Sequence, residues 1–491
     1  MIDLTIHHEN LAHNIRKARE NRVVIPTYRQ MKHPETIPGV IRDRLKAVGL
    51  WDVDPLNLFR ITWKNEAKET GGLYQDVPNY IELPPSLTGV PARIVCLVGK
   101  WFPTGCHKVG ASYGCLVPRL VTGQFDATTD HAVWPSTGNY CRGGAFNSKL
   151  LAVDSVAILP EGMSRERFDW LRSIAGQVIA TPGCESNVKE IFDKANELKR
   201  QPHMMVFNQF EEMGNHLWHY QVTGDAIATV FEHVKRPGDR MAGACFTSGS
   251  AGTIGCGDYL KEQYPAMRLA VGEALQCPTI LNNGFGGHRI EGIGDKHIPW
   301  IHNVKNTDIV IAIDDEDSQR LLRLFNDPAG LRYLRMEAGV DEETLSRLSW
   351  LGISGIANVL CCIKMAKYYE LTGRDVVCTV LTDSAAMYGS RIQELSAQYG
   401  PYDAAAAAVD HQLHMLGLRT DSMEELTYQG RKRVHNLKYY TWVEQQGRTV
   451  DELNDLWYDE EKTWKGVHAQ ADELDGLIEA FNEATGVLKS L

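Results

Sequence analysis

The middle of the chain alternates short apolar runs with stretches long enough for one helix. Each run is rich in β-branched residues and is bounded by Gly, Pro or a polar turn, which is typical of a buried strand. Strands that alternate with helices form βα units around a mainly parallel sheet, buried on both faces. Because the runs exceed one ordinary sheet, the pattern predicts an α/β fold with two lobes. The nine runs are 92–98, 131–134, 154–160, 176–182, 203–209, 240–247, 267–273, 308–314 and 375–383.

The two ends of the chain have different patterns. The first 90 residues are rich in charge, proline and aromatic side chains with poor periodicity, which favours an arm and loops over core structure. Beyond about residue 390 the strand signals stop and helical patterns continue. For the acidic stretch 451–491, a solvated helical face is favoured over an element that covers a lobe or joins two subunits. We expect an N-terminal extension over 1–90, a two-lobed α/β core over 91–392 with a smaller lobe inserted at about 110–225, and a helical C-terminal extension over 393–491.

Charge and hydropathy narrow the classes of partner. The chain of 491 residues carries a formal net charge of −11, whereas nucleic-acid binding depends on clustered Lys and Arg. The first residues lack the apolar core of a signal peptide, and no run of about 18 apolar residues follows. We therefore expect a cytoplasmic protein that binds neither nucleic acid nor a membrane.

The cysteines favour a reducing compartment and give no sign of a metal site. There are 11 of them, between Cys96 and Cys378, with no CxxC pair and no zinc-ligand spacing. Scattered thiols in a large chain are usually buried and reduced. Cys106 and Cys141 flank two of the motifs described below, and for both we favour packing over catalysis.

The loop after the run 92–98 places a lysine, Lys108, at the start of a predicted helix in the sequence FPTGCHKVGASYG. In open α/β sheets, ligands bind beyond the carboxyl ends of strands, where loops enter helices. The positive end of a helix lowers the pKa of a nearby lysine, which favours a neutral, nucleophilic amine. Taken alone, however, this lysine is more simply explained as a surface residue.

Two further loops supply groups that bind anions. Residues 136–139 open a helix and offer hydroxyls and free N–H groups to a carboxylate, although an ordinary helix cap explains them equally well. Residues 249–253 form a turn of small residues with exposed amides, which is typical of a phosphate cradle but weak evidence alone. It is neither a Walker A loop nor GxGxxG. Together the three loops call for a phosphate, a carboxylate and an amine-reactive carbonyl, which pyridoxal phosphate and an amino acid supply.

In these motifs the chain resembles the tryptophan synthase β / cysteine synthase family of pyridoxal-phosphate enzymes, fold type II. PTGCHKVGASYG resembles the segment of the Schiff-base lysine, and PSTGN resembles the PTSGN loop of cysteine synthases. TSGSAGTIGCGDYLKEQYP is similar to the family's phosphate loop and following helix. HRIEGIGDKHIPW, LGISGIANV and VVCTVLTDSAAMYGS are similar to three further family segments. The six motifs follow the family's order over roughly residues 70–392.

The resemblance implies the residues that bind the cofactor, pyridoxal 5′-phosphate. Lys108 would form the internal aldimine and act as general acid and base at Cα and Cβ. His107 would lie close to the phosphate, with a packed core histidine as the alternative. Asn139 would hydrogen-bond the 3′-oxygen, and Ser354 would face the pyridine nitrogen. The phosphate would be bound by Gly249, Ser250, Ala251, Gly252 and Thr253.

The resemblance also implies a pocket for an amino-acid substrate. Ser136, Thr137 and Gly138 would hold its carboxylate. The segment VFNQFEE resembles the family's QQF segment, so Asn208 or Gln209 would line the same pocket. The chain departs from the family in several places: Ala251 replaces a usual Gly, GISG replaces GISSG, PTGCHK is not the NPSGSVKDR of true cysteine synthases, the ETGAGQ loop of tryptophan synthase β is missing, and each end carries about 90 extra residues. The identity of the substrate therefore stays open.

The implied reaction is β-elimination or β-replacement on a serine- or cysteine-type amino acid through an aminoacrylate intermediate, as in cysteine synthase. A hydroxyl at the pyridine nitrogen suits elimination at Cβ. One alternative is a serine/threonine dehydratase-type ammonia-lyase, which Ser354 does not exclude. Another is a non-catalytic binding or regulatory relative, against which the presence of Lys108 and of the phosphate loop argues. We expect a homodimer.

Overall fold

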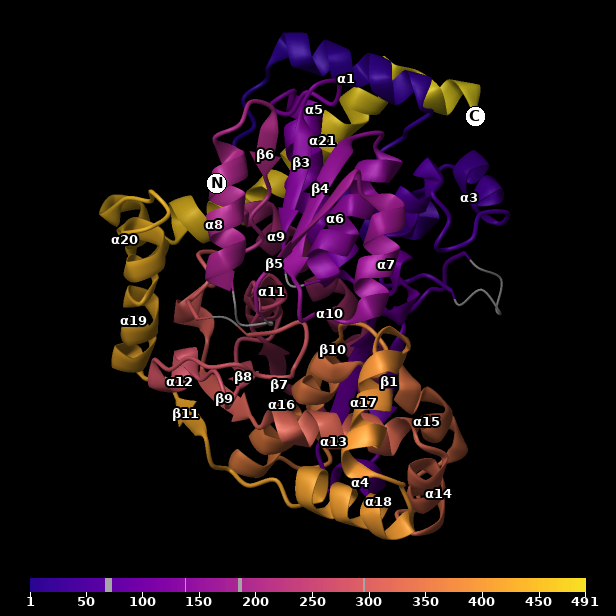
Figure 1. Ribbon diagram of the computed structural model, residues 1–491, viewed down its shortest axis with the longest axis vertical. Coiled ribbons are helices and arrows are strands. Elements are labelled where there is room, and N and C mark those ends of the chain that lie inside the picture. The colour runs from indigo at the N-terminus through magenta and orange to yellow at the C-terminus, as the bar shows by residue number, and fades with distance from the viewer. Residues whose placement is uncertain (67–72, 137, 184–187, 295) are drawn as a thin grey trace.

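The larger of two sheets is built from strands that lie far apart in the sequence. In a computed structural model, which describes residues 1–66, 73–136, 138–183, 188–294 and 296–491, the strand order is β1-β2-β10-β7-β8-β9-β11 (Figure 1). The inner strands are parallel, whereas β1 and β11 pair antiparallel with β2 and β9 at the two edges. The strands are β1 (Tyr80–Leu83), β2 (Arg93–Val98), β7 (Arg240–Thr247), β8 (Arg268–Ala274), β9 (Ile309–Ile313), β10 (Asp375–Leu381) and β11 (Met423–Glu425).

The smaller sheet has four strands in the order β5-β4-β3-β6, all parallel. Its strands are β3 (His131–Pro135), β4 (Asp154–Pro160), β5 (Gln177–Thr181) and β6 (Met204–Val206). All nine predicted runs are strands in the structure, and the two sheets confirm the predicted α/β fold with two lobes.

The larger sheet is buried on both faces because its side chains alternate between two cores. In β2, Val95 and Leu97 belong to one hydrophobic cluster, whereas Ile94, Cys96 and Val98 belong to the other. Helices α10 (Gly224–Val234) and α11 (Gly255–Gln263) contribute to the first cluster. Helices α13 (Asp315–Asn326) and α16 (Ile353–Tyr368) contribute to the second. The strand ends that carry the predicted loops are thus fixed from both sides.

The smaller sheet is covered in the same way. Helices α5 (Lys108–Thr122) and α6 (Asn139–Leu150) pack against each other, and α6 packs on β3 and β4. Helix α8 (Val188–Lys199) covers the opposite face, where Ile191, Ala195 and Leu198 contact the apolar side chains of β3 and β4. Helix α7 (Arg165–Ile174) packs on α6 and β5 of this lobe, whereas α9 (Met213–Trp218) contacts α5 of this lobe and α11 of the larger one.

The two extensions are part of the core, which corrects the expectations of an arm and a solvated helix. Helix α21 (Gly466–Thr485) buries Val467, Leu474 and Phe481 against the same cluster as the small lobe, and it lies beside α1 (His8–Glu20) (Figure 1). The N-terminal segment contributes fully buried side chains such as Ile25 and Trp63. Each extension also adds an edge strand, β1 or β11, that the sequence pattern did not predict.

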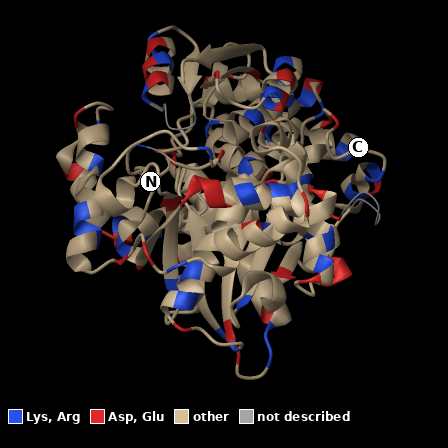
Figure 2. Cartoon of the chain, turned by 60° about the horizontal axis from the view of Figure 1, so that its bottom comes forward, with Lys and Arg blue, Asp and Glu red and all other residues tan. Residues whose placement is uncertain are grey.

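The remaining helices surround these layers. They are α2 (Tyr28–Lys32), α3 (Gly39–Leu45), α4 (Pro85–Thr88), α12 (Thr279–Asn282), α14 (Pro328–Met336), α15 (Glu342–Arg347), α17 (Gly389–Tyr399), α18 (Ala404–His411), α19 (Tyr428–Asn436) and α20 (Val450–Tyr458). Across the described ranges, every helix is too short or too polar to span a membrane. Acidic and basic side chains are interspersed along the helices in Figure 2, in keeping with the modest negative net charge.

Candidate active site

Lys108 lies in the interior, at the point where β2 leads into α5. Its side chain is buried, and its Nζ donates a hydrogen bond to Ser250 Oγ at 3.1 Å. Burial lowers the pKa of this amine to about 8. The interpretation as a surface lysine is therefore wrong. The predicted direction of the pKa shift holds, but its main cause is the loss of solvent rather than the end of the helix.

His107 is buried beside the lysine and packs edge-on against two aromatic rings. Its ring lies 5.5 Å from that of Trp63 and 5.0 Å from that of His219. Burial lowers the pKa of His107 well below its ordinary value, so the ring is neutral. In the part of the chain that the structure describes, neither ring nitrogen has a hydrogen-bond partner. His107 is thus packed in the core and also keeps two polar atoms for a ligand.

The phosphate loop connects β7 to α11 and faces the lysine. A small cavity is lined by His107, Lys108 and four residues of the loop, Gly249, Ala251, Gly252 and Thr253. Considering the described residues alone, the N–H groups of Gly249, Ser250, Ala251 and Thr253 have no acceptor. Ala251 has a φ of 63°, a left-handed conformation that favours glycine. The loop therefore holds Ala251 in a conformation that glycine adopts more easily, and its residues line the cavity. We call Lys108, His107 and residues 249–253 the lysine seat.

The loop between β3 and α6 is partly closed by its own hydrogen bonds. Ser136 Oγ accepts the N–H of Gly138 at 3.1 Å, so this donor is already used. Gly138 has a φ of 151°, and a Cβ at this position would lie 2.3 Å from Arg167 Nη1, so only glycine fits. Thr137 lies outside the described residues. Ser136 and Gly138 lie in the loop that precedes α6, and they offer fewer free donors than the sequence suggested.

Asn139 and Ser354 come together around a glycine of the HRIEGIG segment. A Cβ at Gly292 would lie 3.6 Å from Ser354 Oγ and 3.9 Å from Asn139 Nδ2, and a Cβ at Gly249 would lie 3.2 Å from the carbonyl oxygen of Gly292. Ser354 Oγ and Asn139 Oδ1 are buried polar atoms with no hydrogen-bond partner among the described residues. The backbone at Gly292 thus links the phosphate loop to the two side chains predicted to contact the cofactor ring.

The two residues of the VFNQFEE segment differ in their surroundings. Asn208 Oδ1 accepts the N–H of Phe210 at 3.1 Å, so it stabilises its own turn. The carbonyl oxygen of Gln209 accepts Asn215 Nδ2 at 3.0 Å, and the same amide group donates to Ser250 Oγ at 3.1 Å. Gln209 is therefore tied to the phosphate loop through Asn215, whereas Asn208 is not.

A network of buried charges beside this site was not predicted. Arg167 Nη1 lies 3.2 Å from Glu291 Oε2, and Arg167 Nη2 donates to Tyr388 Oη at 3.1 Å. Tyr388 and Asn139 both donate to Asp383 Oδ2 at 2.7 Å. We call Arg167, Glu291, Asp383 and Tyr388 the charge cluster. Asp383 and Tyr388 lie in the motif VVCTVLTDSAAMYGS, so they could have been found there, but nothing in the local sequence marks Arg167.

The two cysteines near the motifs are buried and unreactive. Burial raises the pKa of both the Cys106 and the Cys141 thiols to about 12. A thiol with such a pKa carries almost no thiolate at neutral pH, which agrees with a role in packing.

The polar groups around Lys108 suit pyridoxal phosphate. Its phosphate needs N–H donors, its ring needs polar side chains at the edge, and its aldehyde needs an amine that can lose its proton. The open N–H groups of residues 249–253 would serve the phosphate, and the unpartnered atoms of Asn139 and Ser354 would serve the ring. Lys108, whose pKa is lowered, would serve the aldehyde. The residues present therefore fit this cofactor.

Comparison with known proteins gives a consistent result. The sequence profile of the family described as pyridoxal-phosphate dependent enzyme matches residues 103–332. The cysteine synthase of Staphylococcus aureus is 29% identical over 260 residues, which cover 53% of this chain and 76% of the relative. Cysteine synthase B of Campylobacter jejuni is 28% identical over 240 residues, 48% of this chain and 71% of the relative. The structure of the O-acetylserine-dependent cystathionine β-synthase of Helicobacter pylori superposes with a TM-score of 0.53 at 23% identity, and the match covers 64% of this chain and 95% of that one.

Proposed function

Because the chain belongs to the family of pyridoxal-phosphate-dependent enzymes, we propose that it catalyses β-elimination or β-replacement on a serine- or cysteine-type amino acid. One observation carries this proposal. A buried amine with a pKa of about 8 lies 3.1 Å from the hydroxyl of a loop whose backbone N–H groups are open. An amine beside an anion cradle is what this cofactor requires.

The chain's own residues would divide the work as follows. When bound, the cofactor supplies an electron sink that stabilises negative charge at the substrate's Cα. Lys108 would take the proton from Cα, because an amine whose pKa is near neutral is partly unprotonated at physiological pH. Its burial keeps water from competing for that proton. The same amine would return a proton at the end of the cycle or pass one to the leaving group at Cβ.

The remaining site residues would bind and orient. Gly249, Ser250, Ala251, Gly252 and Thr253 would hold the phosphate through N–H and hydroxyl groups. His107, which is neutral, would add a hydrogen bond to it without adding charge. Asn139 would bond the 3′-oxygen and Ser354 the ring nitrogen. Ser136, Thr137, Gly138 and Gln209 would hold the substrate carboxylate, and Asn208 would support the turn that positions Gln209.

The relatives support a cysteine-synthase-like reaction over a serine/threonine dehydratase. Two curated relatives from different bacteria are cysteine synthases. A keto-acid assay with and without sulfide separates these reactions. Sulfide should suppress keto-acid formation if a nucleophile adds at Cβ, whereas a dehydratase is indifferent to it. A non-catalytic relative would form no product from any amino acid.

We also propose that the enzyme is a cytoplasmic homodimer. The ten cysteines that the structure describes are all buried and free, as expected in a reducing compartment. Sedimentation of the purified protein tests the dimer, which would have twice the mass of the 55.0 kDa chain.

A screen of amino acids by absorbance tests the proposed reaction. The reconstituted protein should show a violet absorption band that changes when the right amino acid is added. The Lys108→Ala variant should lack the band of the wild-type protein. A wild-type protein that retains no such band after unbound cofactor has been removed would contradict the proposal.

A further inference from the structure

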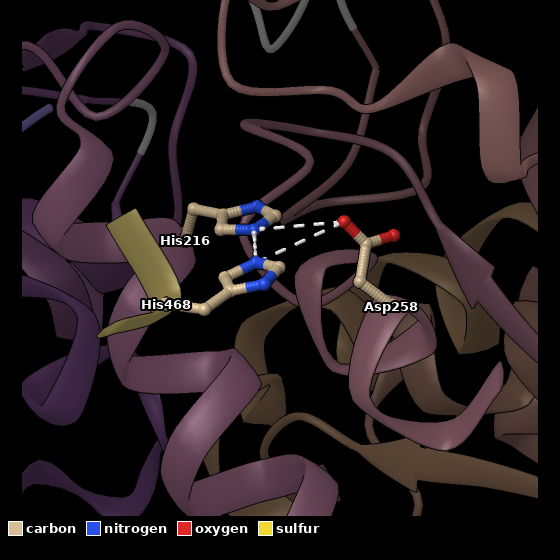
Figure 3. Close-up of side chains that lie close together, drawn as sticks. All are labelled: His216, Asp258 and His468. Carbon is tan, nitrogen blue, oxygen red and sulfur yellow. Dashed lines mark hydrogen bonds and ion pairs between the residues drawn. The ribbon is translucent and has the colours of Figure 1, made fainter. Parts of the chain in front are cut away.

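Three buried side chains outside the active site converge on one point (Figure 3). His216 lies on α9, Asp258 on α11 and His468 on α21, so the group joins the small lobe, the large lobe and the C-terminal extension. The His216 and His468 side chains are 1% and 8% exposed, and that of Asp258 is 3% exposed. The two Nε2 atoms lie 2.9 Å apart, and Asp258 Oδ2 lies 3.8 Å from one and 4.0 Å from the other.

We propose that His216, Asp258 and His468 bind one Zn²⁺ ion. The three separations place a single point about 2.1 Å from each of the three atoms, which is the length of zinc bonds to histidine nitrogen and to carboxylate oxygen. This point lies in the plane of the three ligand atoms, and the two nearly coplanar imidazoles face each other directly, so binding requires a small rotation of the histidine rings away from each other. Two imidazoles and one carboxylate are a common ligand set for zinc, with the fourth position taken by water.

The surroundings of Asp258 also favour a cation. Within the described part of the chain, no lysine or arginine forms an ion pair with this carboxylate, although it is buried. Asn303 Nδ2 donates to Oδ2 and Asn306 Nδ2 donates to Oδ1, each at 2.8 Å. Buried carboxylates are normally paired or bind a metal, and metal-binding carboxylates are normally oriented by further hydrogen bonds. The two amides supply that orientation but carry no positive charge.

The competing arrangement is a hydrogen bond between the two histidines. Without an ion, one imidazole donates its Nε2 proton to the other across the 2.9 Å separation. Zinc needs a lone pair on both Nε2 atoms, so the proton of each ring must sit on Nδ1. On His468, Nδ1 faces Glu262 Oε1 at 3.9 Å, which provides an acceptor after a small side-chain movement. Both states keep the rings neutral, and zinc differs by compensating Asp258.

The position of the ion gives it a structural role. Asn215, the residue before His216, donates to Ser250 Oγ in the phosphate loop, and Gly255 at the start of α11 packs against the His216 ring. An ion at this point would therefore fix α21 to the two helices that support the lysine seat. The sequence gives no hint of it, because the ligands lie far apart in the chain.

Zinc titration of the chelator-treated wild-type protein tests the proposal. Native mass spectrometry should show one tightly bound zinc per folded chain, and added zinc should raise the Tm. His468→Gln should weaken zinc binding more than about a hundredfold, and Asn303→Ala should weaken it by about ten- to a hundredfold. His435→Gln is the matched control, since His435 is equally buried in the C-terminal extension but hydrogen-bonds the carbonyl oxygen of Leu453. It should bind zinc as the wild type does.

Two results would overturn the zinc site. One is a folded wild-type protein that takes up no stoichiometric zinc. The other is a His468→Gln variant that binds zinc as tightly as wild type. If His468→Gln does not fold, a Co²⁺ titration of the wild type decides, because Co²⁺ bound by two imidazoles and a carboxylate gives visible ligand-field bands, whereas free Co²⁺ in water is only faintly coloured.

Discussion

The lysine seat and the charge cluster lie side by side but differ in how many of their polar groups have partners within the protein. In the lysine seat, four N–H groups and both nitrogens of His107 lack partners among the described residues. In the charge cluster each side chain has at least one partner, since Arg167 faces Glu291 and Tyr388 and Asp383 Oδ2 accepts two hydrogen bonds. Asp383 Oδ1 and Glu291 Oε2 accept no hydrogen bond among the described residues. A folded protein leaves buried polar groups open at a cost. We infer that the lysine seat is shaped for a ligand, whereas the charge cluster stabilises the side chains that surround it.

Removal of the lysine should have the largest effect, and on activity alone. We expect Lys108→Ala to lower the turnover rate by about a thousandfold or more, because the group that moves the Cα proton is lost. The Tm of the cofactor-free protein should not fall, since the buried amine contributes little to packing. Steady-state assays and thermal unfolding test the two halves of this prediction. A variant that loses both activity and stability would contradict the division between the seat and the charge cluster.

Neutralising the charge cluster should mainly affect stability. Glu291→Gln removes the carboxylate that faces the buried Arg167 guanidinium at 3.2 Å, and we expect a loss of about 3–5 kcal/mol in the free energy of unfolding. Glu394→Gln is the control. Glu394 pairs with Arg391, which also pairs with Glu291, but it is largely exposed and should cost less than about 1 kcal/mol. Urea unfolding of both variants measures the contrast, and equal losses would show that burial does not distinguish them.

The lysine seat should also give the cofactor-free protein a distinctive dependence on pH. The pKa of Lys108 is about 8 when folded and 10.5 when exposed, so between these values the unfolded chain binds more protons. Stability of the wild type should thus rise with pH across this window relative to Lys108→Met, which cannot titrate. The difference should amount to about 3 kcal/mol. Parallel curves for the two proteins from pH 7 to pH 10 would mean that the amine is not desolvated.

The smallest effect concerns the backbone of the phosphate loop. Ala251→Gly should stabilise the protein by about 1 kcal/mol, because the left-handed φ of 63° costs an alanine more than a glycine. Ala480→Gly, at an exposed position in the middle of α21, should instead cost about 1 kcal/mol. Thermal unfolding should therefore show a higher Tm for Ala251→Gly and a lower Tm for Ala480→Gly. A lower Tm for both variants would count against a strained loop.

The strands were predictable because each combines β-branched residues with clear boundaries. The missed strands β1 and β11 are short, lie at sheet edges, and include polar residues such as Glu82 and Glu424. For α21 the signal was present, since Val467, Ala471, Leu474, Ile478 and Phe481 repeat at helical spacing, but the acidic composition concealed it.

The parts of the candidate site that could be predicted are those formed by residues that are contiguous in the sequence. The loop of small residues and the lysine at a helix start are contiguous in sequence, so their chemistry could be read directly. The charge cluster and the zinc ligands could not be predicted in this way, because their residues are far apart in the sequence and meet only in the folded protein. Arg167 and Glu291, for example, lie on separate lobes. The burial that lowers the pKa of Lys108 is likewise a property of the packed molecule.

Covalent capture at Lys108 is the most direct test of the central claim. The protein reconstituted with pyridoxal phosphate is reduced with borohydride, which converts the C=N bond between cofactor and amine into a stable C–N bond. The digested protein is then analysed by mass spectrometry. The added mass should lie on Lys108 and be absent from the Lys108→Ala variant. Labelling of another lysine, or an unlabelled wild-type protein, would contradict it.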